Sequence, residues 1–258
     1  MTEPLLSVKG LKKTFGRREV VRGVDLFVNP GEIVGLLGRN GAGKTTTFRM
    51  VMGMMQPDAG EINYKGENIA KLPMHLRAKR GIGYLAQEPT IFARMTVAEN
   101  ILAVLEIRDD LSRSDRMKLL VERIDEMGLG DVANSSAETL SGGERRRLEI
   151  ARVMCIDPTI LLLDEPFFGV DPIAVGDIRA MIQKFYERGI SVLITDHDAR
   201  TVLETAERVY IMSEGIIWLS GKSKELVDHP DARARYLGED FYIAPDRIAG
   251  RKQKSASL

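Results

Sequence analysis

The sequence predicts an α/β fold with a mainly parallel, helix-covered sheet, an antiparallel β layer at its N-terminal end and an inserted α-helical subdomain. Three patterns support this prediction. Strand-like apolar runs alternate with helical segments after residue 32, two short strand-like runs precede them, and the pattern from Thr96 to about Asn134 is helical. We expect one domain over residues 1–241, with the helical subdomain at about 90–140, and a flexible C-terminal tail over 242–258.

The composition narrows the class of protein. The length of 258 residues suits one large α/β domain, or a core with a smaller lobe. Lys plus Arg equals Asp plus Glu, 37 each, so no global basic field favours nucleic acid or an anionic membrane. Cys155 is the single cysteine, which excludes an internal disulfide and fits a reducing cytosol. No signal-peptide pattern and no apolar run near 20 residues is present, so we expect a cytoplasmic protein that does not insert into the membrane directly.

The N-terminal part begins with short apolar runs. Strands are expected over 5–8 and 20–28, followed by a turn at Asn29-Pro30-Gly31. The apolar run 32–37 is too short for a helix and predicts a buried strand. A glycine-rich loop and a helix from Lys44 to Gly53 follow it, and then strands near 61–64 and 82–86 with a helix over 73–80 between them.

The later elements are marked by caps. Thr96 and Glu99 form a capping box, in which a hydroxyl and a carboxylate each satisfy a free backbone N–H of the first helical turn. A second helix is expected over 113–127, ending at Gly128, where a left-handed backbone costs little. Asp171 followed by Pro172 predicts the start of another helix. The remaining expected elements are helices to about 155, 187 and 206, strands over 159–163 and 190–195, and a strand pair at 208–212 and 216–219.

The loop at 38–45, Gly-Arg-Asn-Gly-Ala-Gly-Lys-Thr, predicts a phosphate-binding site. It follows a strand and opens a helix, which is the context that this motif requires. Its N–H groups and the helix N-terminus provide positive potential. Lys44 should reach the β- and γ-phosphates, and the Thr45 hydroxyl should bind Mg²⁺. An ordinary glycine-rich turn is the alternative, but the full spacing argues against it. The residues expected to hold the nucleotide are Arg39, Asn40, Gly41, Ala42, Gly43, Lys44, Thr45 and Thr46.

Two acids end the apolar strand before Pro166. Asp164 alone would fit a helix cap, and Asp-Glu-Pro would fit a simple strand end. Beside a phosphate-binding loop, a carboxylate delivered by a buried strand is better interpreted as an Mg²⁺ ligand. Glu165 is then placed to take a proton from the attacking water.

Gln87 and His197 also follow strands. A glutamine there is usually exposed loop, and a lone histidine is more often a surface or core residue. Strand ends of a parallel sheet converge on a nucleotide, however. We therefore expect Gln87 to touch Mg²⁺ or water, and a neutral His197 to donate a hydrogen bond to the γ-phosphate.

Ser141, Gly142, Gly143 and Glu144 form a second capping box at a second glycine-rich helix N-terminus. One nucleotide cannot easily occupy two distant helix N-termini of one chain. A two-fold homodimer solves this problem, because the second N-terminus can close over the partner's nucleotide. The basic run that follows includes Arg145 and Glu149 at i,i+4 spacing, so a solvated, self-paired helix face is expected rather than nucleic-acid binding.

These motifs, in this order, resemble the ATP-binding subunits of ABC transporters over residues 5–241. The resemblance implies an ABC ATPase core of the P-loop NTPase class, ATP and Mg²⁺ as ligands, and a homodimer beneath two integral membrane subunits on the cytoplasmic face of the inner membrane. It also implies that Phe15 stacks on adenine, that Ser141 to Glu144 bind ATP in trans, and that Gly169 and Asp171 belong to the dimer-contacting D-loop.

A finer resemblance is to the lipopolysaccharide-export ATPases. It lies in residues 72–75, 81–85, 87–88, 91–92, 140–147, 168–172 and 193–198, and in Tyr-Leu-Gly-Glu-Asp-Phe at 236–241. It implies a membrane-partner groove that contains Phe92 and Arg94. The chain departs from the family where Ala86, Ala93 and Phe168 stand, the last replacing a usual small residue.

Two alternatives stay open at this point. The same kind of ATPase subunit would also serve a transporter of another substrate, for example one for branched-chain amino acid uptake. A soluble ABC-type protein acting on ribosomes or DNA is the alternative from another class. Such proteins usually carry tandem ATPase units or long coiled coils. This sequence has one phosphate loop, one Ser-Gly-Gly-Glu motif at 141–144 and no heptad run.

Overall fold

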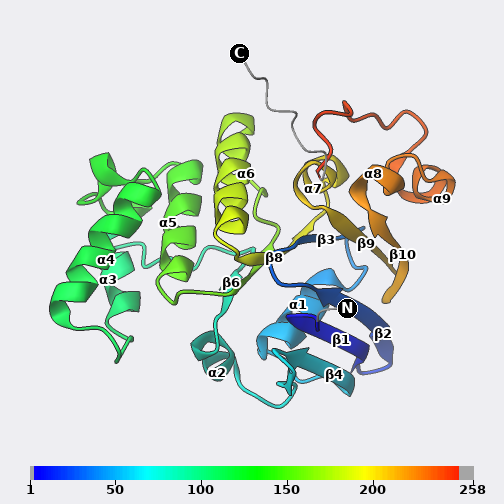
Figure 1. Cartoon of the computed structure of the whole chain (residues 1–258), viewed down its shortest axis with the longest axis horizontal. Coiled ribbons are helices and arrows are strands. Elements are labelled where there is room, and N and C mark those ends of the chain that lie inside the picture. Colours follow the sequence, from blue (N-terminus) through cyan, green and yellow to red (C-terminus); the bar gives the residue numbers. More distant parts are fainter. Residues whose placement is uncertain (1–2, 250–258) are drawn as a thin grey trace.

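The centre of the protein is a six-stranded sheet with the strand order β10–β9–β3–β8–β7–β6, seen in a computed structural model that describes residues 3–249 (Figure 1). Neighbouring strands from β9 to β6 pair in parallel, and only β10 pairs antiparallel, with β9. The mainly parallel sheet is therefore confirmed. Its strands are β3 (Ile33–Gly38), β6 (Ile82–Leu85), β7 (Ile160–Asp164), β8 (Ser191–Asp196), β9 (Arg208–Ser213) and β10 (Ile216–Lys222).

The central strands are buried on both faces, and alternate residues along each strand pack into two different hydrophobic clusters. In β3, Val34 and Leu36 belong to one hydrophobic cluster, whereas Ile33 and Leu37 belong to the other. This split follows from the two-residue period of a strand. Gly35 lies where a Cβ would come within 2.4 Å of Val202, so the helix α7 (Ala199–Thr205) can pack closely on β3 only because this position lacks a side chain.

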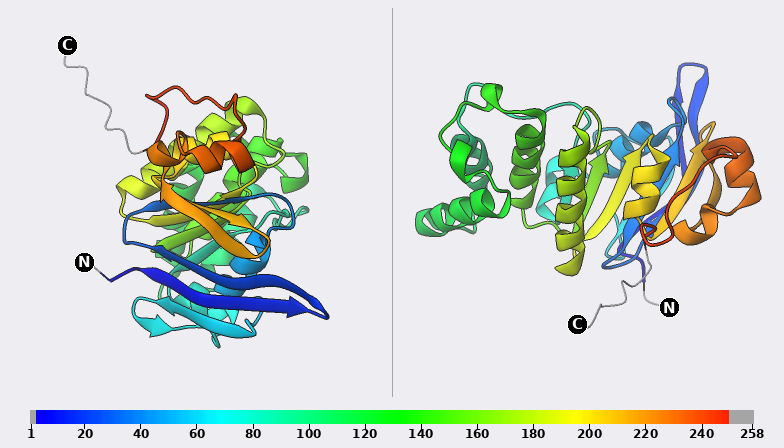
Figure 2. Two further views of the ribbon diagram at one scale, coloured as in Figure 1. Left: turned by 90° about the vertical axis from the view of Figure 1, so that its right-hand side faces the viewer. Right: turned by 90° about the horizontal axis from the view of Figure 1, so that it is seen from above.

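The N-terminal layer is a separate antiparallel sheet in the order β2–β1–β4–β5. The predicted antiparallel layer is therefore confirmed. Its hairpin is longer than the expected strands. The strand expected at 61–64 joins this layer instead of the parallel sheet, because Leu6 to Lys9 pair with Glu61 to Tyr64. Figure 2 shows the layer as a blue and cyan sheet at the edge of the molecule. Its strands are β1 (Leu6–Phe15), β2 (Arg18–Val28), β4 (Ala59–Tyr64) and β5 (Glu67–Asn68), and α1 (Lys44–Met52) packs between the two sheets.

The helical insertion lies at the opposite end of the molecule from the N-terminal hairpin (Figure 2). Both capping boxes are confirmed, at Thr96–Glu99 and Ser141–Glu144, and Asp171 caps its helix as predicted. No helix within residues 3–249 has the length and apolarity needed to cross a membrane. The helices between β6 and β8 are α3 (Val97–Leu105), α4 (Arg113–Glu126), η1 (Gly130–Val132), η2 (Ala137–Thr139), α5 (Gly142–Met154) and α6 (Pro172–Glu187). The helix α2 (Met74–Lys79) precedes β6 and lies apart from the insertion (Figure 1).

The C-terminal part contains elements that no local pattern predicts: α8 (Ser223–Leu226), α9 (Pro230–Ala232) and η3 (Arg233–Leu237). The packed chain also extends beyond the boundary expected at residue 241. Ile243 and Ile248 are buried in the core, and Ala249 donates a backbone hydrogen bond to Leu203 of α7 at 3.2 Å. The packing of these two apolar side chains against the core is not revealed by the sequence. The rest of the expected flexible tail, 250–258, lies outside the described residues.

Arg77 is a fully buried cation that joins α2 to the end of α1. Its guanidinium donates to the carbonyls of Met50 (2.8 Å), Val51 (2.6 Å), Ala70 (2.9 Å) and Leu72 (2.8 Å). Two of these carbonyls belong to the last turn of α1, where a positive charge is favourable. Burial lowers the pKa of Arg77 to about 10, so the charge persists at neutral pH.

We predict that Arg77→Met lowers the free energy of unfolding by about 3 kcal/mol, because it leaves several buried carbonyls without a donor. Urea unfolding followed by circular dichroism measures this loss. Arg80→Met is the matched control: Arg80 is exposed and lies 3.6 Å from Glu67, so its loss should cost less than about 1 kcal/mol. Equal losses in the two variants would contradict the assignment.

Candidate functional site

The carboxyl ends of four strands meet at one pocket. In the sheet, β8 lies between β3 and β7, and β6 lies beyond β7. The phosphate loop follows β3, Gln87 follows β6, Glu165 follows β7 and His197 follows β8. All four contribute to a single pocket of about 550 Å³, together with residues of β2. The sequence-predicted residues that line it are Asn40, Gly41, Ala42, Gly43, Lys44, Thr45, Thr46, Gln87, Glu165 and His197.

The phosphate loop wraps the ammonium group of Lys44. Lys44 Nζ donates to the carbonyl oxygens of Gly38 (2.7 Å) and Arg39 (3.3 Å). Burial lowers the pKa of Lys44, and the nearby Glu165, Asp164 and Asp196 oppose that shift. An anion bound beside Lys44 would favour its charged form in the same way.

The loop is shaped to hold phosphate groups. Gly43 has φ +107°, and a Cβ there would come within 2.8 Å of the Val20 carbonyl oxygen. Only glycine fits, so the backbone can curve and direct its N–H groups toward a ligand at the start of α1.

The two acids after β7 are held in different ways. Asp164 is fully buried, and its Oδ1 accepts a hydrogen bond from the Thr195 hydroxyl at 2.6 Å, while the Tyr84 hydroxyl donates to Oδ2 at 3.3 Å. Burial, followed by the charge of Asp164, raises the pKa of Tyr84. Glu165 has a left-handed backbone with φ +47°, and its N–H donates to the Thr195 carbonyl at 2.9 Å. This turn directs Glu165 into the pocket.

Gln87 and His197 both reach Glu165. Gln87 Nε2 donates to Glu165 Oε2 at 3.0 Å, and His197 Nδ1 lies 3.7 Å from the same oxygen. His197 Nδ1 also lies 3.2 Å from Asp196 Oδ1. Burial raises the pKa of Asp196, whose Oδ2 has no hydrogen-bond partner among residues 3–249. The structure thus brings the three expected catalytic side chains together.

The donors expected for Mg²⁺ are all oxygens: the Thr45 hydroxyl, the Gln87 amide oxygen and an Asp164 carboxylate. Hard oxygen donors of this kind suit Mg²⁺. Thr45 and Gln87 line the pocket, and Asp164 directly precedes the pocket-lining Glu165 in the sequence. The residues present therefore fit a magnesium–nucleotide ligand.

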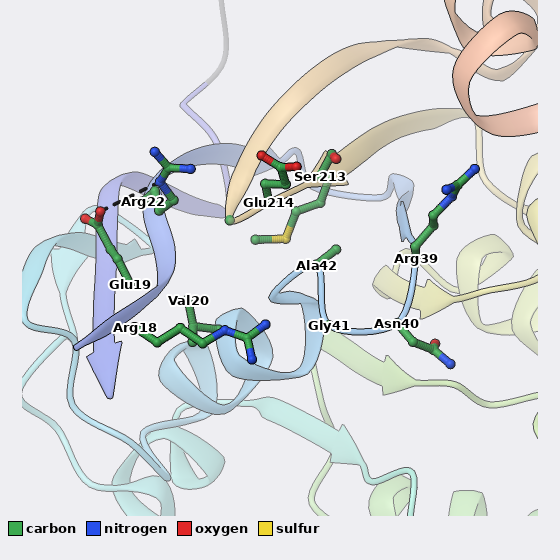
Figure 3. Close-up of a pocket in the computed structure, with 12 residues that line it drawn as sticks. Arg18, Glu19, Val20, Arg22, Arg39, Asn40, Gly41, Ala42, Ser213 and Glu214 are labelled. Atoms are coloured by element: carbon green, nitrogen blue, oxygen red, sulfur yellow. Dashed lines mark ion pairs between the residues drawn. The ribbon is translucent and has the colours of Figure 1, made fainter. Parts of the chain in front are cut away.

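A second pocket of about 580 Å³ continues the first along the phosphate loop (Figure 3). Arg18, Val20, Asn40, Gly41 and Ala42 line both pockets. Figure 3 shows them below Ser213 and Glu214, with Arg18 to the left of the loop and Arg39 to the right. Phe15 is not among the described lining residues. It ends β1 opposite Arg18 and is about half exposed.

The second glycine-rich helix start lies outside this pocket. The Ser141 hydroxyl hydrogen-bonds Glu144 Oε2 at 2.6 Å, and the bonds from Ser141 lower the pKa of Glu144. A Cβ on Gly142 would lie 3.6 Å from the carbonyl oxygen of Gly169, so the two segments expected at a dimer interface adjoin each other.

The basic run of α5 is not the solvated face expected from its sequence. Glu149 pairs with Arg146 at 2.7 Å, at i,i+3, and both side chains are buried. Arg146 also donates to the carbonyls of Ala86 (3.0 Å), Glu165 (3.3 Å) and Pro166 (3.1 Å). The i,i+4 interpretation was wrong because Arg146 turns inward and binds three loop carbonyls.

The loop after Gln87 is tied to the helical insertion. Buried Asn100 accepts the Phe92 N–H at 2.8 Å and donates to the carbonyls of Phe92 (3.0 Å) and Thr96 (3.0 Å). The Arg152 guanidinium lies 4.7 Å from the centre of the Phe92 ring. Phe92 remains 48% exposed, and Arg94 is exposed beside it.

Several residues of the site escaped sequence reasoning. Phe168, Arg18 and Val20 line the pocket, Thr195 holds both acids, and Arg146 joins the loop at Ala86 to the loop at Glu165. Thr195 is the one that a local signal could have found, because it is polar at the end of an apolar strand. The others depend on which segments meet in space.

Comparisons with known proteins agree with this fold. The ABC transporter family profile matches residues 21–168. The chain is 50% identical to the "Lipopolysaccharide export system ATP-binding protein LptB" of Haemophilus influenzae over 239 residues, covering 93% of this chain and 99% of that protein. Among solved structures, MJ1267, an ATP-binding cassette of an ABC transporter in its ADP conformation, superposes with a TM-score of 0.81 and 27% identity, covering 92% of this chain and all of that one. MJ0796, a bacterial ABC transporter cassette with a dimeric structure, matches with a TM-score of 0.77 and 25% identity, over 84% and 98%.

We predict that Arg146→Met lowers the free energy of unfolding by about 3–5 kcal/mol, because it leaves Glu149 charged and buried. Chemical unfolding measures the loss, and hydrogen exchange should become faster over residues 86–90. The double variant Arg146→Met/Glu149→Leu should recover part of the stability. Arg145→Met is the neighbouring control, with a loss below about 1 kcal/mol. A double variant that is no more stable than the single one would argue against the buried pair.

Proposed function

This chain belongs to the ABC transporter family of ATP-binding proteins and is an ATPase, and we propose that it powers lipopolysaccharide export from the inner membrane. The observation that carries the ATPase assignment is the convergence of Lys44, Gln87, Glu165 and His197 on one pocket. The identity of about one half to export ATP-binding proteins, over nearly the whole chain, carries the choice of transported molecule.

The proposed chemistry divides the work among the pocket residues. The loop N–H groups and Lys44 hold the β- and γ-phosphates. Glu165 takes the proton of the attacking water, and Gln87 and Asp196 hold Glu165 and His197 in their orientations. His197 donates a hydrogen bond to the γ-phosphate. Mg²⁺, held by Thr45, Gln87 and Asp164, would neutralise charge on the phosphates.

The proposed unit is a homodimer with two shared ATP sites. Ser141 to Glu144 lie outside the pocket of their own chain, and a dimeric cassette is among the similar solved structures. A two-fold axis would bring this helix N-terminus over the partner's ATP, with Gly169 and Asp171 beside it. Phe15 would stack on adenine from the hairpin that also provides Arg18. ATP then favours the closed dimer, and hydrolysis reopens it.

The proposed docking surface for two membrane subunits is the exposed Phe92 and Arg94. This surface lies on the same loop as Gln87, and Asn100 fixes the loop, so closure of the ATP site would move the docking surface. In this arrangement the protein is peripheral on the cytoplasmic face of the inner membrane. A role in amino acid uptake has less support, because the relatives at 50% identity are named as lipopolysaccharide export proteins.

We predict that Glu165→Gln binds ATP and stabilises a dimer while turnover falls by at least about 100-fold, because the base is lost and the phosphate loop is intact. Steady-state phosphate release, nucleotide binding and size-exclusion chromatography with ATP measure the three properties. Lys44→Ala is the contrasting variant, because it should lose ATP binding itself. Normal turnover in Glu165→Gln would remove Glu165 as the base.

We also predict that Phe92→Ala keeps ATP binding but weakens assembly with the membrane subunits by about tenfold or more, because an exposed aromatic anchor is lost. Co-purification of the tagged protein with its membrane subunits measures this. Met54→Ala is the control, since Met54 is exposed to a similar degree, at 45%, away from this loop. Assembly that survives in Phe92→Ala would exclude this surface.

A further inference from the structure

Phe168 is a large apolar side chain in a polar pocket. It lines the nucleotide pocket together with Lys44, Gln87, Glu165 and His197. Its side chain is 61% exposed, whereas the neighbouring Phe167 is buried in the core. An exposed phenyl ring gains little from the hydrophobic effect, so burial in this chain does not account for its position.

The backbone ties Phe168 to the catalytic turn. The Phe168 N–H donates to the Glu165 carbonyl at 3.1 Å, which closes the turn that follows β7. Glu165 is itself fixed to β8 by its N–H bond to Thr195. The Cα of Phe168 is therefore held in place relative to the end of the sheet, and the next residue, Gly169, turns the chain away with φ +70°.

The ring of Phe168 meets the ring of His197. Their centroids lie 6.2 Å apart and their planes cross at 67°, an edge-to-face arrangement. The His197 side chain is about half exposed, and its polar contacts within residues 3–249 are made by Nδ1, which lies near Asp196 and Glu165. Contacts at one ring nitrogen alone leave the imidazole able to rotate about that nitrogen. An aromatic neighbour on another side restricts the swing.

We propose that Phe168 is a positioning residue that holds the His197 imidazole in its orientation beside Glu165. The inference rests on the proposed function, because it assumes that His197 acts in ATP hydrolysis. Phe168 acts through His197 and not through nucleotide binding. Its loss therefore lowers kcat and leaves the KM for ATP unchanged.

The test compares three substitutions in the full-length protein. Phe168→Ala and Phe168→Leu should lower kcat about threefold to tenfold without changing KM, because both remove the aromatic edge, and Phe168→Tyr should retain activity. Ile173→Ala, which removes another exposed apolar side chain from the following helix, is the control and should stay within about twofold. Full activity in Phe168→Ala, or in Phe168→Leu, would overturn the inference.

A double-mutant cycle separates action through His197 from any other role. In a His197→Ala background, Phe168→Ala should lower kcat no further. A further loss would contradict the proposal. The chain has three histidines, so the ring signals of His197 can be assigned by NMR, and they should shift in Phe168→Ala. Unshifted signals would also count against the contact.

The same variants distinguish failure of this inference from failure of the proposed function. If Glu165→Gln and His197→Ala both keep normal hydrolysis, the proposed mechanism fails. If those two variants lose hydrolysis while Phe168→Ala and Phe168→Leu remain fully active, only the positioning role of Phe168 fails.

Discussion

The hydrogen bond from the Thr195 hydroxyl to Asp164 Oδ1, at 2.6 Å, joins the ends of two neighbouring buried strands. The pocket depends on this junction. Asp164 and Thr195 are direct partners in the parallel register of β7 and β8, and Glu165 continues the pairing through its own N–H. Because both faces of these strands are covered by packed side chains, the acids are presented from a rigid support. Gln87 follows β6 and His197 follows β8, the two neighbours of β7, and both reach Glu165 without a long loop.

Buried polar side chains hold the loops around this support. Arg146 and Asn100 each bind several backbone carbonyls, so the loops that begin at Ala86 and run past Phe92 keep a fixed path with no secondary structure of their own. Such groups are costly to bury unless every donor is used. The same arrangement places the pocket residue Gln87 and the exposed Phe92 on one segment. In the proposed mechanism, a change at the nucleotide would be transmitted to the surface by movement of this short loop.

Two helix N-termini with glycines occur in one chain, and only α1 opens into the pocket. The start of α5 is satisfied by its own capping box, yet it remains at the surface beside Gly169. This separation favours a site completed by a second copy. Phe168 lies between these regions, with its backbone tied to Glu165 and its ring against His197. The aromatic contact gives this chain a way to order a half-exposed imidazole whose polar partners, in the part of the chain that the structure describes, all lie near Nδ1.

The sequence by itself determined the features that depend on neighbours along the chain. The phosphate loop, the capping boxes at Thr96 and Ser141, the cap at Asp171 and the buried strands all follow from spacing over a few residues, because caps and periodicity are local. Tertiary structure decided the rest. It paired β4 with β1, turned Arg146 inward to Glu149, placed Ile243 and Ile248 against the core, and brought Phe168 to His197. Each of these contacts depends on how separate elements pack together, and no local pattern encodes which surfaces will face each other once the sheet has formed.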